Sequence, residues 1–478
     1  MPDLVKKKRF LLSIFIILLC IPVIIYHTHK DLPEGISYAG EIHQVTEEDA
    51  VFLYDLTFES DGELKHEQQI FERAWNLISE AEDFIIVDMF LFNGYYDEDI
   101  PFPDLSSKLA GLLIERKEEN PDMPIIFISD EVNTTYGSHA SPEFEAMKAA
   151  GIPVVMSEME SLRDSNPLYS SVWRIFLQWF GQEGTGWLPN PFAAEAPNVT
   201  LRSYLKLLNV KANHRKLIAT DKGALIPSAN PHDASGFHSN TAFEVRGNIL
   251  QDIIESEKAV ADYSGEHIDF PQYQKREQGG DLELQLLTEG KILQSLLETI
   301  RNASSESEIW IGMFYLADQE VITELLNASD RGADIRLVLD PNENAFGQQK
   351  IGMPNRPVAS ELIENSEGNI DIRWYNTEFE QYHTKMMYIR DGADAVVISG
   401  SANFTRRNLD DLNLENNIKL EGPAEAKPFQ DVQSYFERIW NNEDGIFTLP
   451  LETYKEEQIA PFKRTLYALQ RFFRFTTY

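Results

Sequence analysis

The chain has 478 residues, of which 43% are hydrophobic and 11% aromatic, so it can bury a substantial core and form two or three domains. Its net charge of −35 repels a nucleic-acid backbone, which argues against general nucleic-acid binding, although such a charge is also typical of a surface that is merely solubilising. The single cysteine, Cys20, excludes an intrachain disulfide and a cysteine-based metal cluster, and no His-Glu-x-x-His pattern predicts a zinc site.

An apolar segment, FLLSIFIILLCIPVIIY (10–26), follows the basic cluster KKKR near the N-terminus. Its seventeen uncharged residues are at the short end of a membrane span, so we predict a transmembrane helix within residues 1–30. A cleaved signal peptide and a buried core helix are the alternatives, but no small-x-small cleavage site follows the apolar run. The flanking positive charges predict a single-pass protein of the cell membrane, with a cytoplasmic N-terminus and an extracytoplasmic catalytic region.

The body of the chain is an internal repeat. Two stretches, 45–275 and 280–445, each contain a helical pattern, a buried apolar strand, a second helix and a strand that ends in Asp. The strands are FIIVDMFLF (84–92) and PIIFISD (124–130) in the first stretch, and IWIGMFYL (309–316) and DIRLVLD (334–340) in the second. This alternation predicts two similar α/β halves, each with a mixed sheet flanked by helices.

Two segments have no counterpart in the repeat. The insertion 161–192 in the first half is rich in aromatic residues, and the tail 446–478 ends in the basic and aromatic stretch FKRTLYALQRFFRFTTY (462–478). Both compositions are typical of segments that lie at a lipid–water interface. Packing on the protein's own core is the alternative for each.

Each half carries the same set of polar residues at the same place in the order of strands. These are His214, Lys216, Ser228 and Asn230 in the first half, and His383, Lys385, Ser401 and Asn403 in the second. A His and a Lys two residues apart on a strand point to the same side, and the Ser and Asn follow at the exit of the next strand. Lys would neutralise a phosphate, Asn and Ser would donate hydrogen bonds to it, and His would be the reactive group.

Two histidines match the needs of phosphodiester cleavage. One group attacks phosphorus and the other protonates the leaving oxygen, so a site shared between two similar halves would supply one histidine to each side of the phosphate. A lone histidine on a strand is more often a structural residue, but two copies at equivalent points favour function. Two Lys and two Asn would stabilise the developing charge without a metal, and we expect no cofactor.

The paired motifs resemble the signature of the phospholipase D superfamily, His-x-Lys-x4-Asp followed by Gly-Gly/Ser-x-Asn in two copies. The first copy matches as far as Asp221 and then has Pro227 in place of the glycine. The second has five residues before Asp391 and then a complete Gly-Ser-Ala-Asn at 400–403. Asp beside Gly is typical of turns, so we interpret both Asp residues as serving the hairpin turn, with a longer hairpin in the second half. The resemblance covers residues 50–445.

The resemblance also implies a role for each matching position. His214 would form a phosphohistidine, and His383 would be the general acid and then the base, although the sequence does not establish that order. In the family, an acid about a dozen residues beyond the motif Asn orients a histidine, and Glu244 and Glu415 occupy that place. A surface acid at a strand end is the alternative for each. Lys216, Lys385, Asn230 and Asn403 would hold the phosphate.

Members of the superfamily hydrolyse phosphatidylcholine, exchange phosphatidyl groups or cut nucleic acid. The apolar N-terminal segment and the aromatic insertion favour a phospholipid substrate and the bilayer as a partner. We therefore predict a membrane-anchored, metal-independent hydrolase or phosphatidyltransferase acting on phospholipids. A cardiolipin synthase-type transferase specifically, and an extracytoplasmic nuclease, are the alternatives. The lipid headgroup, the choice of water or an alcohol as acceptor, and the oligomeric state stay open.

Overall fold

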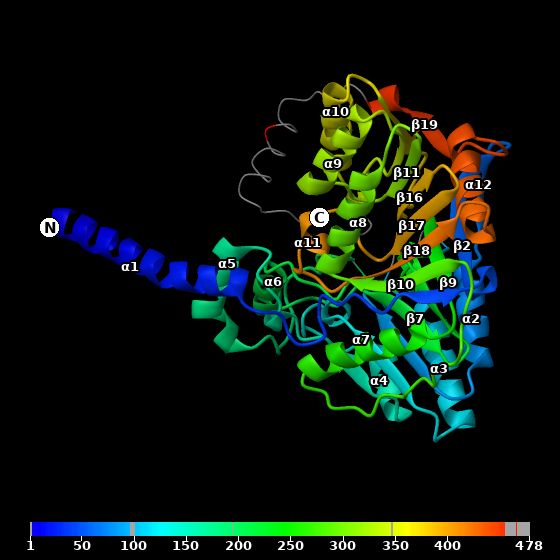
Figure 1. Ribbon diagram of the computed structural model, residues 1–478. Coiled ribbons are helices and arrows are strands. Elements are labelled where there is room, and N and C mark those ends of the chain that lie inside the picture. Colours follow the sequence, from blue (N-terminus) through cyan, green and yellow to red (C-terminus); the bar gives the residue numbers. More distant parts are fainter. Residues whose placement is uncertain (1, 96–100, 194, 346–347, 455–464, 466–478) are drawn as a thin grey trace.

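The computed structural model describes residues 2–95, 101–193, 195–345, 348–454 and 465 (Figure 1). The predicted interfacial stretch 462–478 lies outside these residues, apart from Thr465. The described chain forms two mixed sheets flanked by helices, which confirms the predicted α/β class.

The first sheet is built from residues 50–245. Its strands are β2 (Ala50–Ser60), β3 (Glu63–Glu67), β4 (Ile85–Met89), β5 (Ile125–Ser129), β6 (Val154–Met156), β7 (Lys216–Thr220), β8 (Gly223–Pro227) and β9 (Asn240–Val245). They are arranged in the order β3-β2-β9-β8-β7-β4-β5-β6. The three strands β4, β5 and β6 are parallel, and the other pairs are antiparallel.

The second sheet repeats this arrangement. Its strands are β1 (His43–Val45), β10 (Leu282–Thr288), β11 (Ser307–Met313), β12 (Asp334–Leu339), β15 (Ile370–Tyr375), β16 (Lys385–Asp391), β17 (Asp394–Gly400), β18 (Asn416–Pro423) and β19 (Thr448–Pro450). The order is β1-β10-β18-β17-β16-β11-β12-β15-β19, in which the seven strands from β10 to β15 correspond one by one to those from β2 to β6. A separate hairpin joins β13 (Asn344–Ala345) to β14 (Gln348–Gln349).

Helices of corresponding position flank both sheets. The first half has α2 (Ile70–Glu80), α3 (Ser106–Glu119), α4 (Pro142–Ala149), α5 (Pro167–Val172), α6 (Leu201–Leu207) and α7 (Ile249–Tyr263). The second half has α8 (Gly290–Asn302), α9 (Gln319–Asp330), α10 (Asn355–Asn365), α11 (Arg406–Leu409) and α12 (Lys427–Asn441). Short turns are η1 (Glu47–Asp49), η2 (Glu131–Thr134), η3 (Met159–Ser161), η4 (Trp173–Leu177), η5 (Gln178–Phe180), η6 (Asp233–Ser235) and η7 (Leu451–Tyr454).

The two halves share one core. Helix α7 packs against β10 of the second sheet, and α12 packs against β2 of the first, so each half lends a helix to the other. Rings of the two halves meet there, with the centroids of Phe52 and Tyr435 5.5 Å apart. One cluster of buried apolar side chains draws on both sheets, and each half has a further cluster of its own on the other side of its sheet.

Two predictions about the ends of the chain need correction. Residues 2–29 form one helix, α1 (Pro2–His29), which projects from the body beside α5 (Figure 1). No helix in the described part of the chain is both long enough and apolar enough to cross a membrane, so the predicted transmembrane helix is not supported. The predicted tail 446–478 begins inside the fold, because β19 is the edge strand of the second sheet.

Candidate active site between the two halves

The two histidines lie where the motif hairpins of the two halves meet. The backbone N–H of His214 donates to the carbonyl of Leu414 at 2.9 Å, and that of His383 donates to the carbonyl of Ser239 at 2.8 Å. Each acceptor belongs to the half that does not contain the histidine. Both histidine side chains are buried, with 8% and 7% of their surface exposed. The main chain therefore fixes each histidine against the other half.

The side-chain partners of the histidines also cross between the halves. His214 Nδ1 lies 3.0 Å from Oε2 of Glu415, and His383 Nδ1 lies 3.2 Å from Oδ1 of Asn240. An Nδ1–H that donates to such an oxygen leaves Nε2 of the same ring as the reactive nitrogen. The two partners differ in one respect, since Glu415 carries a charge and Asn240 is neutral.

The structure does not bring Glu244 to a histidine. Its carboxylate is bound by Arg73, with Nε 2.7 Å from Oε2, and by Arg246, with Nη2 2.8 Å from Oε1. Asn240 occupies the position that corresponds to Glu415, because both come directly after the residue whose carbonyl binds the opposite histidine. Aligning SNTAFEV (239–245) with LENNIKL (414–420) could have revealed this pairing, whereas counting from the motif Asn did not.

The two motif serines hold the orienting residues. Ser228 Oγ donates to Asn240 Oδ1 at 2.9 Å, and Ser401 Oγ donates to Glu415 Oε2 at 2.5 Å. Ser401 Oγ also accepts a hydrogen bond from a backbone N–H, as Ser228 Oγ does. Each hydroxyl proton is thereby used inside the protein, so the serines do not donate to a phosphate as predicted. Asn408 donates a further bond to Glu415.

The two lysines are completely buried beside the histidines. Lys216 Nζ donates to the carbonyl of His214 at 2.8 Å, and Lys385 Nζ donates to that of His383 at 2.7 Å. Within the described chain neither ammonium has another hydrogen-bond acceptor, so two donors of each remain available. Phe90 and Phe314 complete the matching environments, with each lysine Nζ above a ring at 5.3 and 5.2 Å.

The motif asparagines are buried near the same place. Asn230 Oδ1 accepts from the backbone N–H of Leu91 at 3.3 Å, whereas Asn403 Oδ1 has no partner among the described residues. No described group accepts a hydrogen bond from the Nδ2 of either amide. Both amides are therefore free to donate to a bound anion.

Burial lowers the pKa values of the histidines and lysines in the site. It lowers the pKa of His214 to about 4, with Lys216 and Lys385 acting in the same direction and Glu415 opposing them. Burial and then Lys385 hold the pKa of His383 well below its ordinary value. The pKa of Lys216 falls to about 7, again through burial. Burial and the neighbouring Lys216 also lower the pKa of Lys385. The protonated form of each group is thus disfavoured by burial, and for His214, His383 and Lys385 also by neighbouring cations. A bound anion would offset this cost, as expected of an anion-binding site.

The two motif aspartates lie at the far ends of their hairpins. Asp221 Oδ1 accepts from the backbone N–H groups of Glu82 and Asp83 at 2.8 and 3.0 Å. Asp391 Oδ1 accepts from the hydroxyl of Ser307 at 2.8 Å. Asp221 thus binds the segment that enters β4, and Asp391 binds the first residue of β11. Strand β16 has seven residues against five in β7, which agrees with the longer second hairpin inferred from the spacing.

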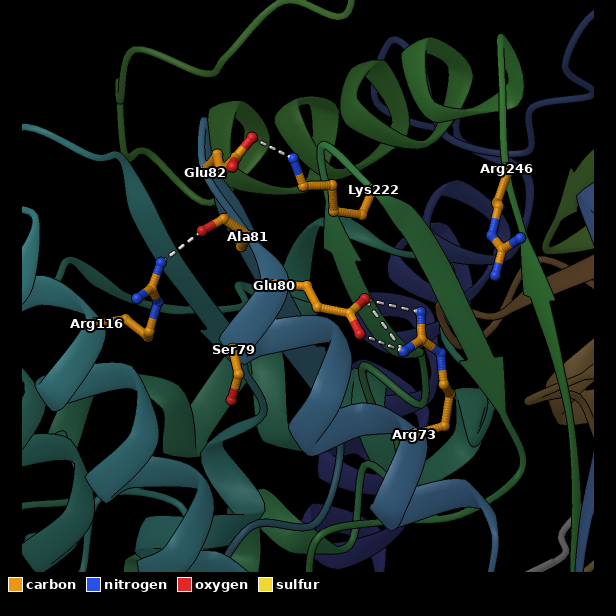
Figure 2. Close-up of a pocket in the computed structure, with 8 residues that line it drawn as sticks. All are labelled: Arg73, Ser79, Glu80, Ala81, Glu82, Arg116, Lys222 and Arg246. Atoms are coloured by element: carbon orange, nitrogen blue, oxygen red, sulfur yellow. Dashed lines mark hydrogen bonds and ion pairs between the residues drawn. The ribbon is translucent and has the colours of Figure 1, made fainter.

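An open hollow of about 730 Å³ lies away from the histidines, at the turn of the first hairpin (Figure 2). Its cations are Arg73, Arg116, Lys222 and Arg246. Figure 2 shows Arg73 against Glu80 and Lys222 against Glu82, so these charges already have partners. None of the predicted catalytic residues lines this hollow.

One group among the described residues has the composition of a metal site, namely Glu41, His43 and Asp252. His43 Nε2 is already bound to Asp252 at 2.7 Å, and Glu41 is paired with Lys275 at 2.7 Å. None of the predicted site residues belongs to this group, and it lies outside the arrangement of histidines and lysines.

Comparison with known proteins agrees with this architecture. Residues 296–440 match the family model described as "Cardiolipin synthase, PLD-like domain". The solved phosphatidylserine synthase of Haemophilus influenzae Rd KW20 is similar over 90% of this chain and 95% of its own, with a TM-score of 0.56 and 11% identity. Nuc of Salmonella typhimurium, a phospholipase D family member, matches 35% of this chain and 99% of its own, with a TM-score of 0.27 and 20% identity. No curated protein sequence gives a significant match.

Residues 296–440 therefore match a phospholipase D-like domain, and the chain shares the fold of the Haemophilus influenzae synthase. This confirms the relationship predicted from the paired motifs. The identity to the synthase is low enough that its structure speaks for the fold alone.

Proposed function

We propose that this chain is a phospholipase D-like enzyme that cleaves and transfers phospholipid phosphodiesters through a phosphohistidine. The observation that carries the proposal is the pair of buried lysines, Lys216 and Lys385. Each ammonium is fully buried with one protein acceptor, beside a histidine whose Nδ1 is held by the opposite half. A buried cation with unused donors is costly unless an anion completes its coordination, and a phosphodiester is such an anion.

In the first step, Nε2 of His214 attacks phosphorus, a P–N bond forms and the bond from phosphorus to the leaving oxygen breaks. The bound phosphodiester anion raises the pKa of His383, so that its ring is protonated on both nitrogens in the complex. The proton on Nε2 then passes to the leaving oxygen, so an alcohol departs. Lys216, Lys385 and the amides of Asn230 and Asn403 stabilise the charge on the phosphoryl oxygens.

In the second step, water or an alcohol gives its proton to Nε2 of His383 while its oxygen bonds to phosphorus and the P–N bond breaks. Water yields phosphatidic acid and an alcohol yields a new phospholipid. The different partners of the histidines support this order. Phosphorylated His214 bears a positive charge, which the carboxylate of Glu415 stabilises, whereas His383 must give up its proton and has only the neutral Asn240.

Exposed apolar side chains support a phospholipid as the substrate and contact with a membrane. Of the insertion aromatics, Trp173 is buried, but Trp179, Phe180 and Trp187 are between 66% and 74% exposed. The insertion is attached to the base of α1, where the backbone N–H of Asp164 donates to the carbonyl of His27 at 2.9 Å. Several apolar side chains of α1 are also exposed, so both segments present apolar side chains suited to a lipid surface. The side of the membrane stays a prediction.

The test incubates the purified full chain, with chelator, with vesicles of phosphatidylglycerol or phosphatidylcholine and separates the lipid products. Phosphatidic acid would identify a hydrolase, and cardiolipin with release of glycerol would identify a transferase. Replacing either His214 or His383 by Ala should abolish turnover, while Glu244→Gln provides a matched control outside the site. DNA cleavage without lipid turnover would refute the lipid substrate, and full activity in either histidine variant would refute a shared site.

A further inference from the structure

A third histidine, His238, lies beside the active site. Its ring centroid is 5.9 Å from that of His383, with the two rings inclined by 47°. It is half-buried and lies two residues before Asn240, the residue that orients His383. His238 takes no part in the two proposed steps of the reaction.

One nitrogen of His238 has a structural role. Its Nδ1 accepts a hydrogen bond from the backbone N–H of Gln381 at 3.2 Å. The corresponding place in the other half holds Asn413, whose Oδ1 accepts from the backbone N–H of Ala212 at 3.1 Å. Each acceptor lies two residues before an orienting residue, and each donor lies two residues before a catalytic histidine. An asparagine is therefore sufficient to brace the chain at this position.

Compared with an asparagine at this position, His238 has a second ring nitrogen, Nε2, that can take part in another hydrogen bond. Because Nδ1 accepts a hydrogen bond, the proton of the neutral ring is on Nε2, which becomes a donor. Burial, helped by His232 and Lys385, lowers the pKa of His238 to about 3, so the ring is neutral near pH 7. No described residue is hydrogen-bonded to Nε2.

His238 is next in the sequence to Phe237, a member of an apolar cluster, and its ring is close to His383. Phe102, Phe237 and Phe379 form a partly exposed ring cluster, with centroids of neighbouring rings between 5.6 and 6.3 Å apart. His238 follows Phe237 directly in the sequence and faces His383, the histidine that serves the leaving oxygen. His214 is on the other side of the phosphate in the proposed mechanism.

We propose that Nε2–H of His238 donates a hydrogen bond to the alcohol part of the phosphodiester, next to His383, with the three phenylalanines as the apolar wall of this subsite. The ligand class is a small hydroxylated alcohol, as the departing headgroup or as the acceptor that replaces it. This proposal rests on the proposed function, because it uses His383 as the acid on the leaving-group side.

The test measures binding in the full chain carrying His214→Ala, which removes the nucleophile. Isothermal titration calorimetry compares this protein with His214→Ala/His238→Asn and His214→Ala/His238→Ala. The probes are glycerophosphoglycerol, which has an alcohol arm, and inorganic phosphate, which has none. Asn keeps the acceptor for Gln381, as Asn413 does for Ala212, and removes the Nε2 donor.

We expect His238→Asn to weaken glycerophosphoglycerol binding about tenfold, the value of one buried hydrogen bond, and to leave phosphate binding unchanged. Equal affinity for the diester, equal weakening of both probes, or no diester binding in the His214→Ala protein would each overturn the proposal. Failure of the proposed function is seen separately, as absence of lipid turnover by the unmodified chain. A selective loss of diester affinity would then still support the contact made by His238.

Discussion

Binding of a phosphodiester should draw protons from solution, because burial lowers the pKa values of the two lysines in the free protein. Burial lowers the pKa of Lys216 to about 7. A bound anion favours the charged form, which raises that pKa toward the ordinary value of a lysine. A group whose pKa rises on binding takes up protons, and the uptake is largest between the two pKa values.

The size of the effect follows from the pKa of Lys216. At pH 8 an amine with a pKa of about 7 is roughly one-tenth protonated, so full protonation in the complex takes up about 0.9 proton from this residue. At pH 6 the same amine is already about nine-tenths protonated, and its uptake falls to about 0.1 proton. Lys385 adds to the total, since its pKa is lowered as well.

Calorimetry of glycerophosphoglycerol binding to the His214→Ala protein would measure this uptake. A phosphodiester does not titrate near neutrality, so the dependence of the heat on the buffer's ionisation enthalpy reports protons taken up by the protein. We expect about one proton or more at pH 8 and a clear reduction at pH 8 in Lys216→Met. The part of the uptake that Lys216→Met removes should be smaller at pH 6. Zero uptake or proton release at pH 8 would show that both lysines are already charged in the empty site and would refute the argument.

Three further outcomes are expected. Glu415→Gln should lower kcat about 10- to 100-fold, because a charge-assisted hydrogen bond to His214 contributes roughly 1.5–3 kcal/mol, and a variant with unchanged kcat would contradict the orienting role. Glu244→Gln should leave kcat within about twofold but lower the free energy of unfolding by about 1–3 kcal/mol, since Arg73 loses a buried partner, as denaturant unfolding would show. Trp179→Ser should reduce sedimentation of the protein with phospholipid vesicles without changing turnover of a soluble diester, and unchanged sedimentation would argue against lipid contact.

Much of this site could be predicted from the sequence because the His-x-Lys and Ser-Ala-Asn motifs occur once in each half. The spacing His-x-Lys on a strand places both side chains on one side of the sheet. A second copy at the same point of the repeat favoured a functional role for the histidines over a purely structural one. The same comparison predicted that the late Asp391 serves its hairpin turn and not the phosphate. In the structure its carboxylate binds Ser307, at the start of the neighbouring strand β11.

The orienting residues were harder to predict, because they depend on contacts between the halves. Counting along the chain selected Glu415 and Glu244, but the loop after the motif Asn has different lengths in the two halves. The carbonyls of Ser239 and Leu414 accept hydrogen bonds from the histidines of the opposite halves, so these two residues are at equivalent positions in the two halves. Asn240 is the residue in register with Glu415, and Glu244 lies further along β9 with its own arginine partners.

This interlocking explains why the two halves are folded into one body. A buried ion pair between them places Arg215 of the first half 2.8 Å from Oε1 of Glu289 in the second, and the same oxygen accepts from the backbone N–H of Glu415 at 3.0 Å. Removing one partner of a buried pair costs far more than an exposed pair contributes. The contact that joins the halves therefore also holds the carboxylate that orients His214, so forming the interface and assembling the reactive histidine are one event.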